Sequence, residues 1–245
     1  MSKLRLQKIL ANAGICSRRK AEVLLIQKRV EINGKTAKLG DKADPISDEI
    51  LLDKHPLISS KNYKLILLNK PKGIISTCKD PQGRITVLDL IPEELQKGLH
   101  IVGRLDLESR GAILLTNYGE LTMQLTHPRY AHTKTYHVLI NGIPSKKTLR
   151  NWSDGVILDG KKTMRASIEL LEATIRKSLL EITLVEGRNR QIRRVSESFG
   201  HRVIDLKRTA IGKLELNNLR EGSWRKLEEK EWDLLLKTPQ NTDFR

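Results

Sequence analysis

The chain has 245 residues, of which 38% are hydrophobic and 30% are charged, and this composition is typical of a folded globular protein rather than a disordered or fibrous one. Its 45 Lys and Arg residues outnumber its 29 Asp and Glu residues, so the formal net charge at pH 7 is +16. A charge of this sign and size favours a nucleic-acid partner. The alternative is a basic surface that only keeps the protein in solution.

The sequence carries no signal for secretion, membrane insertion or metal binding. Its first residues, MSKLRLQKIL, lack the apolar core of a signal peptide, and no segment approaches the roughly 18 apolar residues of a membrane span. Cys16 and Cys78 form no Cys-x-x-Cys pair, and the six histidines are scattered. We therefore expect a cytoplasmic protein with no membrane partner, no metal site and no disulfide framework.

The first forty residues predict two short helices followed by a strand and a tight turn. Gly14 ends the first helix, and Ser17 is placed to cap the second. The strand Val30–Ile32 leads into the turn Asn33-Gly34, a pair that accepts the positive φ angles of a hairpin. The apolar residues expected to form the buried side of the two helices are Leu6, Ile9, Leu10, Val23, Leu24 and Leu25.

Basic residues are concentrated in this same region. If the helices bury their aliphatic sides together, these cations stay on an outer surface that is open to phosphates. A merely solvated helical face is the alternative, because most runs of charge are of that kind. The candidate RNA contacts are Arg5, Lys8, Arg18, Arg19, Lys20 and Lys35, with Lys28 and Arg29 nearby.

A short polar stretch, PLISSKN at 56–62, precedes a new apolar segment and predicts a linker. We place the domain boundary there, with a small N-terminal domain over residues 1–59 and a larger domain over residues 60–245. The second part interleaves strands with a few helices, which favours an α+β domain built on a mostly antiparallel mixed sheet with flanking helices and a central cleft. The expected strands are 65–68, 112–116, 136–140 and 179–185, and the expected helices are 120–125 and 191–199.

The segment GRLDLESRGAILLT, residues 103–116, places a carboxylate, Asp106, on a loop between two apolar strands. A loop carboxylate on a rigid sheet can serve as nucleophile, general base or metal ligand, or it can simply shape the loop as an Asx-turn. Asp106 and Glu108 are also two residues apart, as paired carboxylates of a hydrolase could be, although Glu108 is more simply a solvated loop residue.

Two further segments carry residues of interest. In KTYHV, residues 134–138, Tyr136 lies on a strand among basic neighbours, where it can stack on an unstacked base or merely pack in the sheet. In EGRNRQIRRVSESFG, residues 186–200, a turn precedes a helix that carries several arginines. Arg193 can form an exposed ion pair with Glu197 one turn later, or can lie against Asp106 and keep it ionised at neutral pH.

Taken together and in order, these motifs resemble the pseudouridine synthases of the RsuA/RluB type, which modify ribosomal RNA. The resemblance rests on GRLD with its apolar strand and the turn T-N-Y-G-E-L, then K-T-Y, then E-G-R-N-R-Q-I-R-R. Residues 1–50 or so also resemble the small RNA-binding domain named after ribosomal small-subunit protein four, through RLQKILANAGICSRRKAE and V-x-I-N-G-K. Tyr118 departs from the pattern, because many relatives carry aspartate at that position of the turn.

The resemblance implies a role for each matching residue in a reaction that needs no cofactor. Asp106 would be the catalytic nucleophile, Tyr136 would stack on the target uracil, and Arg193 would pair with the carboxylate. Ile192 would form an apolar wall of the pocket, and Arg104 would contact the RNA or the flipped nucleotide. Arg190 and Arg194 are further candidates for RNA contact.

The resemblance also implies the partner, which would be ribosomal RNA or a pre-ribosomal particle. The motif E-G-R-N-R-Q-I-R-R is closer to members that act on the large ribosomal subunit, so we expect a uridine of 23S rRNA. A 16S rRNA enzyme and a non-catalytic ribosome-assembly protein remain the alternatives. Because no heptad seam is visible, we expect a monomer.

Overall fold

The computed structural model describes residues 3–57, 63–127, 130 and 132–236. The chain divides into two compact units: the first holds Met1–Leu65 with Pro92–His100 and Thr116–Gly119, and the second holds Ile66–Ile91, Ile101–Leu115 and Glu120–Arg245. The predicted boundary between residues 59 and 60 lies outside the described residues and stays a prediction.

Two helices form the start of the first unit, α1 (Leu6–Asn12) and α2 (Arg18–Ile26). Ser17 caps α2 as predicted, because its hydroxyl accepts a hydrogen bond of 3.2 Å from the backbone N–H of Lys20. Leu6 and Leu10 are fully buried between the helices. Val23 differs from the prediction, since 48% of it is exposed on the outer side of α2.

A small antiparallel sheet packs on these helices. Its strand order is β3-β2-β5-β6, and a two-residue pair, β1 with β4, lies beside it. Asn33 and Gly34 join β2 to β3 with φ angles of 47° and 74°, which confirms the predicted hairpin turn. The strand bounds are β1 Leu4–Arg5, β2 Val30–Ile32, β3 Lys35–Thr36, β4 Lys42–Ala43, β5 Ile50–Leu52 and β6 His55–Pro56.

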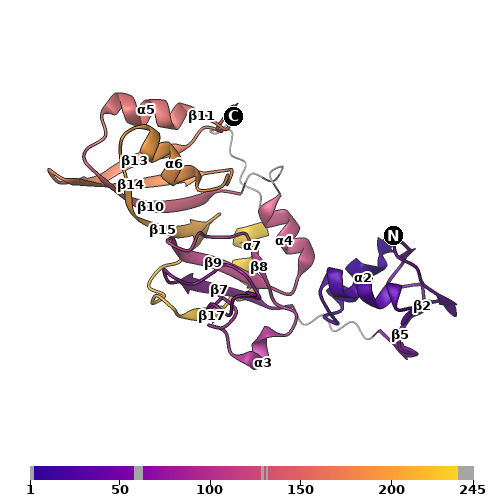
Figure 1. Ribbon diagram of the computed structural model, residues 1–245. Helices are drawn as coiled ribbons and strands as arrows, with labels where there is room; N and C mark the ends of the chain where they lie inside the picture. The colour runs from indigo at the N-terminus through magenta and orange to yellow at the C-terminus, as the bar shows by residue number, and fades with distance from the viewer. Residues whose placement is uncertain (1–2, 58–62, 128–129, 131, 237–245) are drawn as a thin grey trace. The chain divides into compact units, whose positions relative to one another are not determined.

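The second unit is built on one nine-stranded sheet in the order β13-β14-β10-β15-β9-β7-β17, with β16 on β15 and β8 on β9 (Figure 1). The strands predicted at 65–68, 112–116, 136–140 and 179–185 are found as β7, β9, β10 and β14. The strand bounds are β7 Leu65–Lys70, β8 His100–Val102, β9 Arg110–Thr116, β10 Lys134–Asn141, β13 Ser167–Ala173, β14 Lys177–Leu184, β15 Val203–Ile211, β16 Leu214–Glu215 and β17 Trp224–Lys226.

The sheet is mixed, as predicted. β10 pairs antiparallel with both β14 and β15, whereas β15 and β9 run parallel, with Arg208 beside Gly111. The two backbones approach so closely that a Cβ built at Gly111 would lie 2.2 Å from the carbonyl oxygen of Arg208. Only glycine fits this position, and it directly follows the loop that carries Asp106.

Helices cover the sheet near β10 and β14. Figure 1 shows α5 and α6 on the same side of these strands, and their residues Trp152, Ile192 and Val195 share a buried cluster with Val138 and Leu180. This packing brings the start of α6 next to β10, where Tyr136 lies. The remaining elements are α3 Glu93–Gln96, α4 Gly119–Thr126, α5 Lys146–Asp154, β11 Ile157–Leu158, β12 Lys161–Lys162, α6 Gln191–Ser198 and α7 Glu229–Leu236.

Candidate active site

Asp106 lies on the loop between β8 and β9, as the sequence predicts. Gly103 turns the chain out of β8 with a φ of 74°, and the backbone N–H of Ser109 bonds the carbonyl oxygen of Asp106 at 3.0 Å. The carboxylate itself forms no hydrogen bond and no ion pair within the described part of the chain. It is half-buried, so it faces a cavity rather than the core.

Residues outside this loop hold its backbone in place through hydrogen bonds. The hydroxyl of Ser76 donates to the carbonyl of Leu105 at 2.7 Å and accepts from its N–H at 3.2 Å. The ammonium of Lys70, at the end of β7, reaches the carbonyl oxygens of Ser109 at 2.8 Å and Asp106 at 3.3 Å. A loop fixed in this way positions its carboxylate before any substrate arrives.

Lys70 is fully buried, which is unusual for a charged residue. Its Nζ also donates to Pro71 at 2.9 Å and to Leu107 at 3.4 Å, so four carbonyl oxygens share its three protons. Burial lowers the pKa of Lys70 to about 8, and the nearby negative charge of Asp106 opposes that shift. The lysine thus places a positive charge against the backbone of the loop that carries Asp106.

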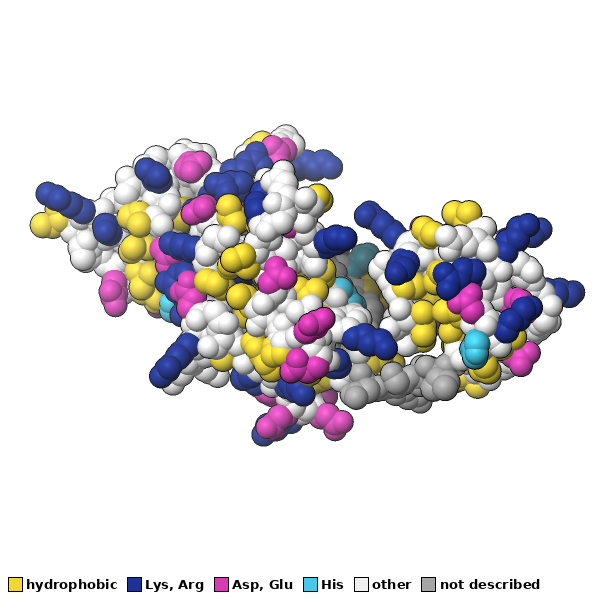
Figure 2. Space-filling view, turned by 60° about the horizontal axis from the view of Figure 1, so that its bottom comes forward, with side chains coloured by type: hydrophobic (Ala, Val, Ile, Leu, Met, Phe, Trp, Pro, Cys, Tyr) yellow, Lys and Arg dark blue, Asp and Glu magenta, His cyan; other side chains and the backbone are white. Residues whose placement is uncertain are grey.

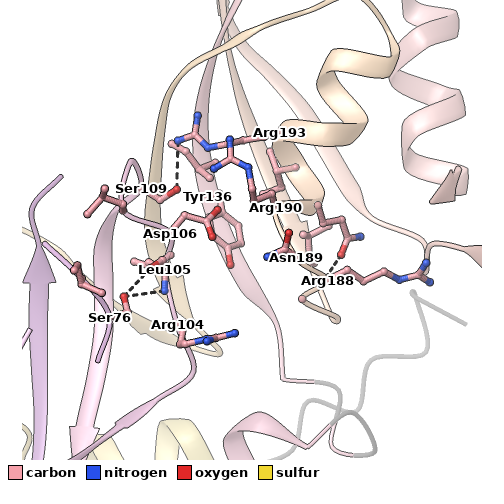
Figure 3. A pocket seen from close by; sticks show the side chains of 17 residues that line it. Ser76, Arg104, Leu105, Asp106, Ser109, Tyr136, Arg188, Asn189, Arg190 and Arg193 are labelled. Carbon is pink, nitrogen blue, oxygen red and sulfur yellow. Dashed lines mark hydrogen bonds between the residues drawn. The ribbon is translucent and has the colours of Figure 1, made fainter. Parts of the chain in front are cut away.

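Tyr136 forms a wall of the same cavity. Its ring is 9% exposed and packs in the buried cluster with Leu105, Leu184 and Ile192. The ring packs in the core and also lines the cavity next to Asp106 (Figure 3), and its stacking on a base stays a prediction. An aromatic face at such a place can stack on a planar base.

The turn before α6 is a rigid structure built by its own polar residues. Gln191 donates from Nε2 to Glu186 at 2.8 Å, and its Oε1 accepts the backbone N–H of Arg188 at 3.0 Å. The Arg188 guanidinium bonds the carbonyls of Leu158, Lys161 and Lys162, and it pairs with Glu186 at 3.1 Å. Glu186, Arg188 and Gln191 thus fix the turn and leave the other arginines for other contacts.

Arg193 reaches the loop that carries Asp106, but not through the predicted ion pair. Its terminal nitrogen donates to the carbonyl oxygen of Glu108 at 2.9 Å and to the hydroxyl of Ser109 at 3.3 Å. In the part of the chain that the structure describes, no ion pair within 4.0 Å joins it to Asp106 or to Glu197. Burial lowers the pKa of Arg193, and the neighbouring charge of Arg190 lowers it further, while Asp106 opposes both.

Arg190 begins α6 in a strained conformation. Its φ of 49° lies in the left-handed region, and its side chain forms no capping hydrogen bond. The guanidinium is exposed at the cavity, where Figure 3 shows it between Arg193 and Asn189. The cavity measures about 460 Å³, and its charged lining residues are four arginines and one carboxylate: Arg104, Arg188, Arg190, Arg193 and Asp106.

The structure therefore brings six of the predicted site residues to one cavity and separates the others. Arg194 points elsewhere, since it pairs with Asp159 through hydrogen bonds of 2.9 and 2.5 Å. Among the predicted N-terminal cations, Lys8 is half-buried and the others are exposed on the first unit, and Figure 2 shows basic side chains standing out from that surface. The six residues that line the cavity are Arg104, Asp106, Tyr136, Arg190, Ile192 and Arg193.

Tyr118, the position that departs from the family pattern, makes a local contact. Its ring stacks on that of Tyr63, with centroids 4.2 Å apart and planes inclined by 23°. Neither residue lines the cavity that holds Asp106. The departure therefore concerns packing in the first unit and not the chemistry at the carboxylate.

Sequence reasoning missed Lys70, Ser76 and Ser109, which hold the carboxylate loop. Lys70 carried a usable signal, because a lysine followed by proline ends the apolar run 65–68 and a cation in that place needs acceptors. The sequence carried no such signal at Ser76 and Ser109, since single serines in loops are common and the partners of these two are distant in the chain.

The described residues contain no group of three or more His, Cys, Asp or Glu side chains arranged to hold a metal ion. Within the same residues, the helices are all too short or too polar to cross a bilayer. The cavity itself offers one carboxylate beside an aromatic ring, in a strongly cationic setting. Such a site suits a planar, anionic ligand that reacts with a carboxylate.

Comparison with known proteins adds family evidence to this geometry. Residues 64–198 match the family described as RNA pseudouridylate synthase, and residues 4–50 match the S4 domain. "Ribosomal large subunit pseudouridine synthase B" of Bacillus subtilis is 41% identical over 226 residues, which cover 91% of either chain. "Dual-specificity RNA pseudouridine synthase RluF" of Escherichia coli K12 is 36% identical over 98% of this chain and 81% of its own.

The fold has a counterpart among solved structures. One of them, described as a pseudouridylate synthase, superposes with a TM-score of 0.69 at 30% sequence identity, over 95% of this chain and 99% of that chain. The likeness includes the N-terminal region as well as the nine-stranded sheet, since nearly the whole chain is covered.

Proposed function

The chain belongs to the RNA pseudouridylate synthase family, and from this premise we propose that it converts a uridine of ribosomal RNA to pseudouridine with Asp106 as the nucleophile. The observation that carries the proposal is the cavity in which the unpaired Asp106 carboxylate lies beside the ring of Tyr136. It is the only carboxylate among the lining residues that the structure describes, so the hydrolase alternative with Glu108 as a second carboxylate loses its support.

The reaction needs only groups that the cavity offers. The bond from N1 of uracil to C1′ of ribose breaks, a bond from C5 to C1′ forms, and the proton on C5 is lost while N1 gains one. No electrons are gained or lost overall, so neither an oxidant nor a cofactor is required. Asp106 attacks C1′ or the base, or first removes a proton at C2′, and all three routes need an ionised carboxylate.

Tyr136 and the arginines serve binding in this proposal. The ring of Tyr136 stacks on the uracil after the nucleotide has left its helix, and Ile192 and Leu105 form apolar walls. Arg104, which is exposed and lines the cavity, contacts the RNA around the flipped nucleotide. Arg193 holds the loop of Asp106 through Glu108 and Ser109.

The substrate we favour is 23S rRNA. The Bacillus subtilis relative, at 41% identity, is named for the large ribosomal subunit, and this name supports 23S rRNA as the substrate. The Escherichia coli relative is named as a dual-specificity enzyme, and neither name identifies a target nucleotide. The exposed cations of the S4 domain supply a second RNA-binding surface, with Arg5, Arg18, Arg19, Lys20 and Lys35 as contacts. We also propose that the protein acts as a monomer in the cytoplasm.

Release of tritium from RNA labelled at uracil C5 tests the proposal. The protein is incubated with large-subunit and small-subunit rRNA transcripts in parallel, and with the corresponding immature ribosomal particles. Release from the large-subunit RNA or particle alone supports the favoured substrate, and release from the small-subunit RNA alone assigns the enzyme there. RNA binding without tritium release from either transcript or either particle contradicts catalysis and favours an assembly role.

A further inference from the structure

A second cavity of about 250 Å³ lies next to the active site, and it is also lined by cations. Arg190 and Arg193 line both cavities, so the two cavities adjoin each other at these side chains. The second cavity adds Lys72 and Arg202 as cations and Glu108 and Glu197 as anions, which leaves a formal excess of two positive charges. The volume of the second cavity is several times the roughly 30 Å³ that one water molecule occupies in the liquid.

Arg193 carries the strongest sign that a ligand belongs there. The residue is 7% exposed, and its Nε–H group is buried without a hydrogen-bond partner among the described residues. Its terminal nitrogen is used by Glu108 and Ser109, so the unpaired donor belongs to a side chain that also lines the second cavity. A buried N–H group without an acceptor is costly, and an anion supplied by a ligand would satisfy it.

The other cations that line the second cavity differ in whether their side chains already have a partner. The side chain of Arg202 is exposed and has no hydrogen bond or ion pair in the described part of the chain, and the same is true of Arg190. Lys72 pairs with Asp205 at 2.7 Å. Asp205 also pairs with Arg110 at 2.7 Å, and although burial raises the pKa of Asp205, the hydrogen bonds from Arg110 and Lys72 lower it to about 2. Lys72 is thereby held at the cavity wall by a carboxylate that stays ionised.

We propose that this second cavity binds a phosphodiester group of the RNA backbone, next to the nucleotide whose base enters the active site. The proposal rests on the proposed function, because the closeness of the two cavities matters only if a base occupies the first. In an RNA chain each base is joined through its ribose to a phosphate on either side. A base stacked on Tyr136 therefore places a phosphate within one nucleotide of Arg190 and Arg193, and the fork of a guanidinium matches the geometry of that group.

Arginine side-chain NMR tests the site directly. The Nε–Hε signals of the protein are followed while inorganic phosphate replaces chloride at constant ionic strength. We expect saturable shifts of the Arg193 and Arg202 signals. The variant Arg202→Gln should raise the apparent dissociation constant for phosphate at least about fivefold, as loss of a charge-assisted hydrogen bond predicts. The control is Arg176→Gln, an exposed arginine between β13 and β14 that lines neither cavity, and it should bind phosphate as the wild type does.

A second arm asks whether the phosphate comes from RNA. Octauridylate should move the same arginine signals at a concentration at least about tenfold lower than inorganic phosphate, because several phosphates and a base bind together. Uridine without phosphate should affect the Tyr136 region only. The absence of a phosphate-specific shift, or an unchanged constant in Arg202→Gln, would overturn the site. Octauridylate that leaves these signals in place would overturn its assignment to RNA. None of these readouts depends on turnover, so a failure of the proposed catalysis is distinguished from a failure of the phosphate site.

Discussion

Arg193 donates a hydrogen bond of 2.9 Å to the carbonyl oxygen of Glu108, two residues after Asp106, and not to the Asp106 carboxylate. The guanidinium thus acts on the backbone of the loop that carries Asp106. The positive charge still lies near the carboxylate, since the charge of Asp106 raises the pKa of Arg193 against the effect of burial. The arrangement fixes where the carboxylate lies and leaves its oxygens available for the substrate.

Substitution of Arg193 by methionine should therefore impair turnover through the position of the loop. We expect kcat at saturating RNA to fall about 100-fold, the scale associated with a displacement of catalytic groups by about 1 Å. The matched control is Arg194→Met, whose guanidinium pairs with the exposed Asp159 and should matter little for kcat. Equal losses of kcat in the two variants would contradict a specific role for Arg193.

Lys70 should support both the stability and the activity of the protein. Substitution by methionine keeps the length of the side chain but removes the donors to Pro71, Asp106, Leu107 and Ser109. We expect the free energy of unfolding to fall by about 2–3 kcal/mol, as for lost hydrogen bonds to a buried charge, and kcat to fall with it. Urea denaturation and single-turnover kinetics measure the two effects. Lys79→Met, at an exposed position, is the control, and a Lys70→Met protein as stable as this control would refute the role.

Gly111 should be irreplaceable for a steric reason. An alanine there would place its Cβ 2.2 Å from the Arg208 carbonyl oxygen at a φ of 106°, so β9 and β15 could not stay paired beside the loop that carries Asp106. We expect a loss of about 3 kcal/mol or more in the free energy of unfolding. A Cβ at Gly160 would meet open space, and the φ there is 72°, so Gly160→Ala should lower the free energy of unfolding by only about 1–2 kcal/mol. Thermal unfolding of both variants checks the difference, and similar losses would argue against close packing at Gly111.

The stability of the protein should depend on the protonation of Lys134. Burial and, to a smaller extent, the charge of Arg208 together lower the pKa of Lys134 to about 8 in the folded state, against 10.5 in an unperturbed lysine. The folded state thus loses this proton at a lower pH than the unfolded state does. Between these two values the unfolded chain binds more protons, so the contribution of Lys134 makes the free energy of unfolding rise with pH.

Urea denaturation at about pH 7.5 and pH 9.5 measures this contribution. The wild type should gain stability relative to Lys134→Met between the two pH values. The same pH dependence in both proteins would show that Lys134 titrates alike in the folded and unfolded states.

Local patterns in the sequence were sufficient for the elements that carry the site. Ser17, the turn Asn33-Gly34 and the strands around Gly103 and Gly111 are governed by neighbours in the chain, so they could be predicted. Asp106, Tyr136 and Arg193 were found through the family resemblance, because their segments are far apart and no spacing rule joins them. The structure brings them to one cavity.

The partners of side chains could not be predicted from the sequence. The motif E-G-R-N-R-Q-I-R-R contains four arginines, and only the fold shows that Arg188 and Arg194 hold structure while Arg190 and Arg193 line the cavity. The roles of Lys70 and Ser76 have the same origin, since all their acceptors except the carbonyl of Pro71 are backbone carbonyls more than twenty residues away. The exposed Val23 shows that an apolar residue on a short helix need not face the core.

The most direct measurement is tritium release from uracil C5 of ribosomal RNA, compared between the wild type, Asp106→Asn and Glu108→Gln. Asp106→Asn should bind RNA normally but release no tritium above background, because its amide can neither attack carbon nor accept a proton as a carboxylate does. Glu108→Gln should keep most of the activity, since its exposed side chain lines the second cavity and not the one that holds Asp106. Release by Asp106→Asn at the wild-type rate would contradict the central role of this carboxylate.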